Sequence, residues 1–135
     1  MIIFFSSLNV FPQDRDMIPY ISLNPAEFHE ELTIVNNPLI ADVREPFEYR
    51  GSRLPGAINV PSRDALNKMA DTLDRATYIF LYCTTDVRSI TVAKLLSEKG
   101  FIHVYSLNGG IAKWRKAGLP VERIKIKRRS QKTGS

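Results

Sequence analysis

The chain holds a single cysteine, two histidines and no long hydrophobic run, and each of these shortages excludes a class of structure. One cysteine, Cys83, cannot form an internal disulfide, so nothing in the chain requires an oxidising compartment. His29 and His103, with no second cysteine nearby, give no metal cluster, and we expect no metal and no cofactor. No apolar stretch approaches the length of a membrane span, so we expect a cytoplasmic protein without a membrane partner.

The length and composition fit one ordinary globular domain. A chain of 135 residues can bury a single core, and 44% hydrophobic with 24% charged residues is a typical balance. The apolar run from Met1 to Phe5 lacks the basic n-region of a signal peptide, and it is too short to form the apolar core of one. We therefore expect an N-terminal extension over residues 1–17 and one folded domain over residues 18–121.

The net charge of +5 is concentrated at the C-terminus. Residues 122–135 carry six basic side chains against Glu122, whereas residues 1–121 carry equal numbers of basic and acidic side chains. This pattern is typical of a solvated, disordered basic tail. Weak attraction to RNA or to an acidic surface is the alternative, but no aromatic residues are interleaved, so we do not expect a nucleic-acid partner.

Apolar runs of strand length alternate with helical patterns. The runs cover residues 39–43, 57–60, 78–82 and 103–107. One helix is predicted to begin at Asn24-Pro25, and another to cover residues 89–99 with Gly100 as its stop. This alternation predicts an α/β fold, with a parallel sheet and helices on both faces. Ligand sites in such sheets lie beyond the carboxyl ends of the strands, where Asp42, Arg44 and Cys83 are expected.

Cys83 follows an apolar strand and precedes a helix, which places its thiol near free backbone amides and the positive end of a helix dipole. Both stabilise the reactive thiolate. The predicted anion-binding loop consists of Thr84, Thr85, Asp86, Val87, Arg88 and Ser89. Two interpretations stay open at this point, because a free cysteine at the end of a core strand is often only a small buried hydrophobe.

The other polar residues of this region also have two interpretations. The hydroxyls of the loop serve either as donors to a bound anion or as helix caps. Arg88 either binds an anion directly or braces the loop against Glu45 or Glu48. Asp42 is expected to be a buried acceptor for loop amides. Neither histidine is placed as a general base, and a thiolate already ionised by its loop needs none.

Four motifs in order resemble those of the rhodanese-like family. They are Asp42-Val43-Arg44-Glu45-Pro46 with Glu48-Tyr49, Leu54 to Pro61, Cys83 to Ser89, and Gly100 to Trp114. The resemblance implies a five-stranded parallel sheet and a catalytic Cys83 that carries sulfane sulfur as a persulfide. It also implies an external donor, thiosulfate or a persulfide, and a thiol or protein acceptor. Asp42, Arg44 and Glu48 would support the site.

The chain departs from the family pattern at positions that bear on substrate choice. Asp86 stands where the family usually carries glycine, and its charge would oppose an anionic donor. Thr84 replaces an arginine common in active members, and Ser52-Arg53 replaces glycine and histidine. These departures affect the expected substrate and rate more than the fold.

Three functions are compatible with the sequence. The first is a sulfurtransferase or persulfide carrier, and the second is a non-catalytic binding or regulatory module. The third is a phosphatase or arsenate reductase, whose loop would place five residues between cysteine and arginine. Here four residues separate Cys83 from Arg88, which favours sulfur transfer.

Overall fold

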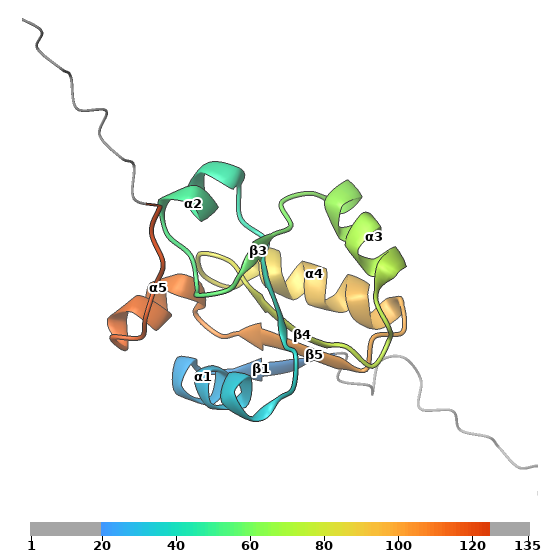
Figure 1. The fold of residues 1–135 in the computed structure, drawn as a ribbon, viewed down its shortest axis with the longest axis horizontal. Helices are drawn as coiled ribbons and strands as arrows, with labels where there is room; N and C mark the ends of the chain where they lie inside the picture. Colours follow the sequence, from blue (N-terminus) through green and yellow to red (C-terminus); the bar gives the residue numbers. More distant parts are fainter. Residues whose placement is uncertain (1–19, 125–135) are drawn as a thin grey trace, which may run out of the picture.

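The structure, a computed structural model, describes residues 20–124 of the chain. In this part, five strands alternate with five helices (Figure 1). The strands are β1 (Ile21–Leu23), β2 (Leu39–Asp42), β3 (Ile58–Asn59), β4 (Tyr78–Tyr82) and β5 (His103–Leu107). The helices are α1 (Pro25–Ile34), α2 (Pro46–Gly51), α3 (Arg63–Thr72), α4 (Val87–Glu98) and α5 (Gly110–Lys116).

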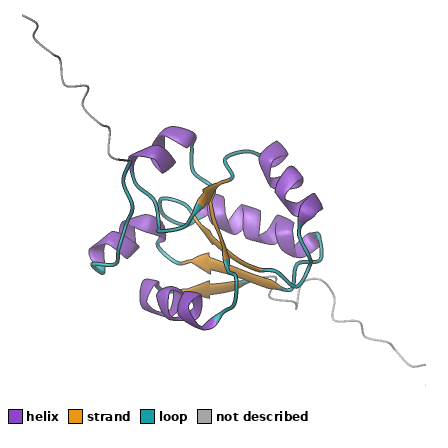
Figure 2. Cartoon of the chain, in the orientation of Figure 1, coloured by secondary structure: helices purple, strands orange, loops and turns teal. Residues whose placement is uncertain are grey.

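The strands form one parallel sheet in the order β1-β5-β4-β2-β3. β4 is central, with Phe80 opposite Ile40 of β2 and Tyr105 of β5. Because neighbouring strands run in the same direction, the carboxyl ends of β2 and β4 meet at one edge of the sheet. The predicted α/β class and the five-stranded parallel sheet are both confirmed (Figure 2).

Two hydrophobic cores cover the two faces of the sheet. The side chains of β4 alternate between them, as the two-residue period of a strand requires. Ile79 and Leu81 pack with α3 and α4, whereas Phe80 and Tyr82 pack with Trp114 of α5 and with α1. Helices therefore lie on both faces, as predicted (Figure 1).

The helices predicted from the sequence have the expected ends. Asn24 caps α1: its side chain accepts from the amide of Glu27, while the Glu27 carboxylate accepts from the amide of Asn24. α4 begins two residues earlier than predicted, at Val87. Gly100 follows the end of this helix with a φ of +93°, a left-handed conformation that glycine adopts without steric cost. Four elements were not predicted individually: β1, α2, α3 and α5.

The end of the described chain returns to the body of the fold. Glu122 and Arg53 exchange two backbone hydrogen bonds, of 2.8 and 2.9 Å, in an antiparallel bridge. Glu122, which the sequence prediction assigns to the tail, is therefore anchored here. Residues 1–17 and 125–135 lie outside the described residues. No helix within residues 20–124 is long and apolar enough to cross a membrane.

Candidate active site

Cys83 lies one residue beyond the end of β4, at the carboxyl edge of the sheet. Its side chain is 1% exposed, and its Sγ lies 3.6 Å from Oγ of Ser89. The Ser89 hydroxyl donates to the carbonyl of Asp86 at 3.0 Å and accepts from the hydroxyl of Ser106 at 3.2 Å. The sulfur therefore contacts one buried hydroxyl, that of Ser89, which is itself hydrogen-bonded to a second buried hydroxyl, that of Ser106.

The start of α5 holds the backbone of the Cys83 loop in place. The carbonyl of Cys83 accepts from the amide of Ile111 at 2.9 Å, and the carbonyl of Thr84 accepts from Ala112 at 3.2 Å. Gly110 makes this approach possible, because a Cβ there would lie 2.5 Å from the carbonyl oxygen of Cys83. The conformation of the loop therefore depends on a segment that is distant in the sequence.

Asp86 links the loop to α5 through its side chain. It occupies the N-cap position of α4, where a carboxylate usually accepts from the first turn of its own helix. Here no such bond forms, and Oδ1 of Asp86 instead accepts from the amide of Gly109 at 2.8 Å. The first amides of α4 are thus left without a side-chain cap from this residue.

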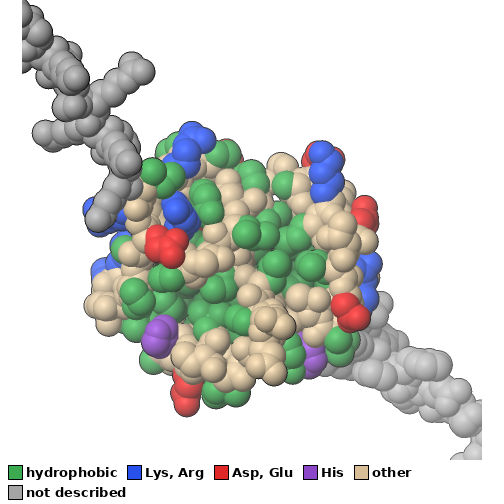
Figure 3. Space-filling view, in the orientation of Figure 1, with side chains coloured by type: hydrophobic (Ala, Val, Ile, Leu, Met, Phe, Trp, Pro, Cys, Tyr) green, Lys and Arg blue, Asp and Glu red, His purple; other side chains and the backbone are tan. Residues whose placement is uncertain are grey.

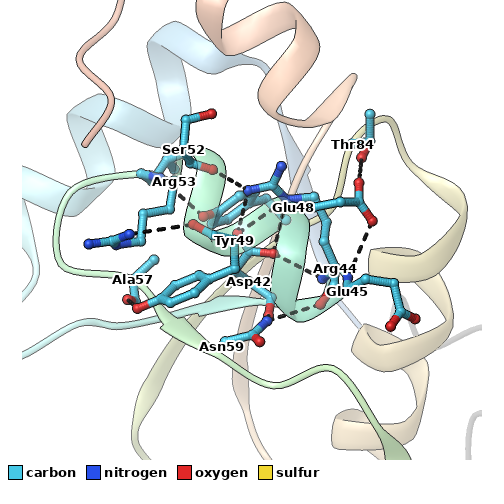
Figure 4. Close-up of polar contacts among 12 residues, drawn as sticks. Asp42, Arg44, Glu45, Glu48, Tyr49, Ser52, Arg53, Ala57, Asn59 and Thr84 are labelled. Atoms are coloured by element: carbon cyan, nitrogen blue, oxygen red, sulfur yellow. Dashed lines mark hydrogen bonds and ion pairs between the residues drawn. The ribbon is translucent and has the colours of Figure 1, made fainter. Parts of the chain in front are cut away.

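Glu48, Thr84 and Arg88 form a closed triangle of hydrogen bonds at the mouth of the loop. Arg88 donates to both carboxylate oxygens of Glu48, at 2.8 and 3.3 Å, and to Oγ1 of Thr84 at 2.9 Å. The Thr84 hydroxyl donates to Glu48 at 2.8 Å (Figure 4). Of the two carboxylates that the sequence offered to brace Arg88, the structure selects Glu48.

The triangle shifts the ionisation of both charged members. The hydrogen bond from Arg88, followed by that from Thr84, lowers the pKa of Glu48 to about 2 against the opposing effect of burial. The same bond to Glu48 raises the pKa of Arg88 above its ordinary value. Both groups are therefore charged over the whole physiological range, and their charges cancel locally.

Asp42 and Arg44 form a buried ion pair beside β2. Arg44 donates to the Asp42 carboxylate through Nε, Nη2 and its backbone amide, with Nη2 at 2.7 Å. Nη2 also donates to the carbonyl of Ser52 at 2.6 Å (Figure 4). Asp42 thus accepts from a loop amide, as expected. Within residues 20–124, the side-chain hydrogen bonds of this pair reach the segment after α2, at Ser52, and not the Cys83 loop.

The phenol of Tyr82 completes this buried polar group. Its hydroxyl accepts from the amide of Leu54 at 3.0 Å. Burial, followed by the charge of Asp42, raises the pKa of Tyr82 far above its ordinary value, so the phenol stays neutral. The pair and the phenol together tie β2 and β4 to the loop that carries Leu54.

A cavity of about 370 Å³ lies beside the Cys83 loop, between α3 and α4. Apolar residues dominate its lining, with Val43 and Val60 from the sheet side and Val87 and Leu95 from α4. Arg88 lines the end next to the loop. Hydrophobic side chains also gather in the centre of the face shown in Figure 3, with charged groups toward its margins.

Comparison with known proteins shows which family has these features. A family model for the rhodanese-like domain matches residues 24–117. The chain belongs to this family. Among curated relatives, it is 33% identical to the thiosulfate sulfurtransferase GlpE of Actinobacillus succinogenes, over 64% of this chain and 77% of the relative. It is 39% identical to a tRNA sulfurtransferase of Desulfurococcus amylolyticus over 76% of this chain, which spans only 21% of that relative.

Solved rhodanese-like structures share the fold. The rhodanese-like domain of an Anabaena protein is 28% identical, with a TM-score of 0.69, and the match covers 88% of this chain and 89% of that one. A rhodanese-related protein of Thermoplasma volcanium is 31% identical, with a TM-score of 0.65, and the match covers 76% of this chain and 98% of that one.

The structure brings most of the predicted site residues of this rhodanese-like domain together. Cys83 and Ser89 are in contact, and Thr84, Arg88 and Glu48 meet at the mouth of the loop. Thr85 and Val87 are exposed, and Val87 also lines the neighbouring cavity. Asp42 and Arg44 lie one strand away, in a separate buried pair.

Ser106 is the residue near the sulfur that the sequence prediction missed. It is 1% exposed, and it stands between the buried Val104 and Leu107 in β5. A hydroxyl in a strand that is otherwise apolar on its buried side was the available signal. Without the fold, nothing indicated that this hydroxyl lies against Ser89.

Proposed function

We propose that this rhodanese-like domain is a sulfurtransferase or persulfide carrier in which Cys83 is the nucleophile. The position of Cys83 carries the proposal: its sulfur sits between the end of β4 and the start of α4, in contact with the Ser89 hydroxyl. The first amides of a helix lack partners within the helix, and they stabilise a negative charge on sulfur. The sulfurtransferase names of two relatives support the same activity.

The proposed reaction has two displacement steps. In loading, the Cys83 thiolate attacks the outer sulfur of the donor, and the donor's S–S bond breaks with its electron pair on the leaving group. In unloading, an acceptor thiolate attacks the outer sulfur of the Cys83 persulfide and releases the Cys83 thiolate. Each step is a balanced two-electron displacement without an added oxidant. With one cysteine in the chain, both donor and acceptor are other molecules.

The residues around the sulfur have distinct proposed roles. Ser89 contacts Cys83, and its hydroxyl can turn to donate to a thiolate or persulfide. Glu48, Thr84 and Arg88 act as positioning residues that hold the mouth of the loop. Asp42 and Arg44 support the site from a distance by fixing the segment after α2.

A non-catalytic binding module is the second candidate, and one observation favours it. Cys83 is only 1% exposed, so a donor has little direct access to the sulfur. A phosphatase or arsenate reductase is less well supported, because the guanidinium of Arg88 is already bound to Glu48. Such enzymes need a cation that is free to bind a tetrahedral oxyanion.

Intact-mass analysis tests the proposal. The protein is incubated with thiosulfate, and separately with cysteine persulfide, beside a Cys83→Ser variant. Wild type should gain one sulfur atom that cyanide removes, and the variant should gain none. Ser97→Ala, a serine on the same helix α4, is the control for an ordinary small substitution. Absence of a gain from either donor, on folded protein, would leave the binding module as the better conclusion.

A further inference from the structure

The charges around the Cys83 loop do not suit a small dianion. Arg88 contributes one positive charge, but both of its Nη groups are bound within the triangle with Glu48 and Thr84. Its charge is therefore balanced by a carboxylate at distances of 2.8 and 3.3 Å. Any anion that enters the loop meets a guanidinium that is already neutralised.

Asp86 adds an unbalanced negative charge to the same loop. Its carboxylate accepts from the amide of Gly109 at 2.8 Å, and it makes no ion pair among those found in residues 20–124. A neutral amide donor fixes the position of this carboxylate without cancelling its charge. Asp86 thus links the loop to the segment before α5, and it places a negative charge three residues from Cys83.

The charge that must enter the loop differs strongly between donors. Thiosulfate is a dianion, so its reaction with the Cys83 thiolate gathers three negative charges and yields the Cys83 persulfide anion and sulfite. A protonated organic persulfide, RS–SH, brings no charge on its reacting atoms. Its attack by the thiolate gathers one negative charge and yields the Cys83 persulfide and the thiolate RS⁻. Both reactions balance, but only the first places a dianion beside Asp86.

We infer that Asp86 determines donor choice, so that this site takes sulfur from organic persulfides in preference to thiosulfate. The inference rests on the proposed sulfur transfer by Cys83 and narrows its donor class. The carboxylate repels the dianion directly, and the Glu48–Arg88 pairing removes the cation that would compensate. The half-charge at the start of α4 attracts any anion, but it is smaller than the full charge of Asp86.

Removing the charge of Asp86 without removing its hydrogen bond tests this inference. Asp86→Asn keeps an oxygen that can accept from Gly109. Asp74→Asn is the matched control, because Asp74 also accepts from a backbone amide, that of Ala76 at 2.7 Å, in an exposed turn before β4. The measured quantity is the initial rate of sulfur loading onto Cys83, by intact mass, from thiosulfate and from cysteine persulfide.

In wild type and in the control, cysteine persulfide should load faster than thiosulfate by the same ratio. In Asp86→Asn that ratio should fall about tenfold, because a dianion near the protein surface loses a repulsion of that order. Added salt should speed loading from thiosulfate in wild type and have a smaller effect in Asp86→Asn. A third arm with persulfidated serum albumin shows whether a protein-borne persulfide is also a donor.

The two proposals fail in different ways. Loading from neither donor overturns the sulfur-transfer function, and with it the inference about Asp86. Loading from both donors at equal rates, or a ratio unchanged by Asp86→Asn, overturns the inference and leaves sulfur transfer intact. Circular dichroism of each variant confirms that the comparison is between folded proteins.

Discussion

The hydroxyl of Ser106 donates to the hydroxyl of Ser89 across 3.2 Å, and Ser89 in turn contacts the sulfur of Cys83. Ser89 and Ser106 are 0% and 1% exposed, so water does not replace either bond readily. When Cys83 is ionised, Ser89 can donate to the sulfur while it still accepts from Ser106. Ser106 therefore orients the hydroxyl that contacts the proposed nucleophile.

Ser106→Ala should make Cys83 less reactive without changing the fold. A lost buried hydrogen bond costs about 1 kcal/mol, so the rate of alkylation of Cys83 by iodoacetamide at pH 7 should fall by up to about fivefold. Ser22→Ala is the control, because Ser22 is exposed and pairs with Ser106 in the sheet register. An alkylation rate that matches wild type would show that Ser106 has only a packing role.

Gly110→Ala should damage the loop far more than an equivalent change elsewhere. A Cβ at Gly110 would lie 2.4 Å from the carbonyl oxygen of Thr85, and the backbone there has a φ of +59°. Overpacking and the left-handed conformation together should lower the free energy of unfolding by about 3 kcal/mol. Sulfur loading should fall as well, because the clash is with the Cys83 loop itself.

Gly118→Ala separates the two contributions. Gly118 has a φ of +73°, but a Cβ there would have nothing within 4 Å. In urea denaturation, Gly118→Ala should lower the free energy of unfolding by about 1 kcal/mol, from backbone strain alone. Equal costs for the two variants would mean that α5 moves aside easily and does not hold the loop.

Glu48→Gln should change how stability depends on pH. The pKa of Glu48 is lowered to about 2, against 4.5 for an ordinary glutamate, so the unfolded chain binds this proton more tightly than the folded protein. The carboxylate therefore stabilises the fold fully above about pH 4.5, and this contribution is lost as the pH falls toward 2.

Urea denaturation from pH 7 to pH 2 measures the effect. Near neutral pH, the free energy of unfolding of wild type should exceed that of Glu48→Gln by about 1 kcal/mol, and the difference should vanish near pH 2. The expected difference is no larger because Arg88 is partly exposed, and solvent screens its charge. Glu98→Gln, at the exposed end of α4, is the control. A constant difference across this range would mean that Glu48 does not carry the charge that braces the loop.

How far the sequence predicts the fold depends on the kind of element. β4 and β5 are apolar runs flanked by turns, and α4 ends at a glycine, so their patterns are strong. β1 is three residues long with two of them exposed, and α2 has six residues, so neither shows a full period. α3 was missed although Ser62 caps it and Leu66 and Ala70 lie four residues apart on its buried side.

The site was predictable only where its residues are close in the sequence. Cys83, Arg88 and Ser89 lie within seven consecutive residues, so the sequence alone groups them in one candidate loop. The partner of Arg88 lies 40 residues away, and Glu45 and Glu48 could not be distinguished without the orientation of α2. Ser106 lies 17 residues from Ser89, and only the parallel pairing of β4 with β5 brings them together.

The buried pair of Asp42 and Arg44 should matter far more for stability than for sulfur transfer. Asp42→Ala leaves the guanidinium of Arg44, on a side chain only 4% exposed, without its partner, which should cost about 3–5 kcal/mol in the free energy of unfolding. Asp42→Ala combined with Arg44→Met should recover part of that loss, because no unpaired charge stays buried. Sulfur loading per folded molecule should be close to wild type in the double variant.

Asp64→Ala provides the contrast for this last prediction. Asp64 pairs with Lys68 at 3.2 Å, but both side chains are about four-fifths exposed, so the cost should be below about 1 kcal/mol. Urea denaturation and loading assays on the same samples separate the two effects. If the folded double variant loaded sulfur much more slowly than wild type, the Asp42–Arg44 pair would have to act on the Cys83 loop through β2 and β4. Its role would then be to position the nucleophile as well as to stabilise the fold.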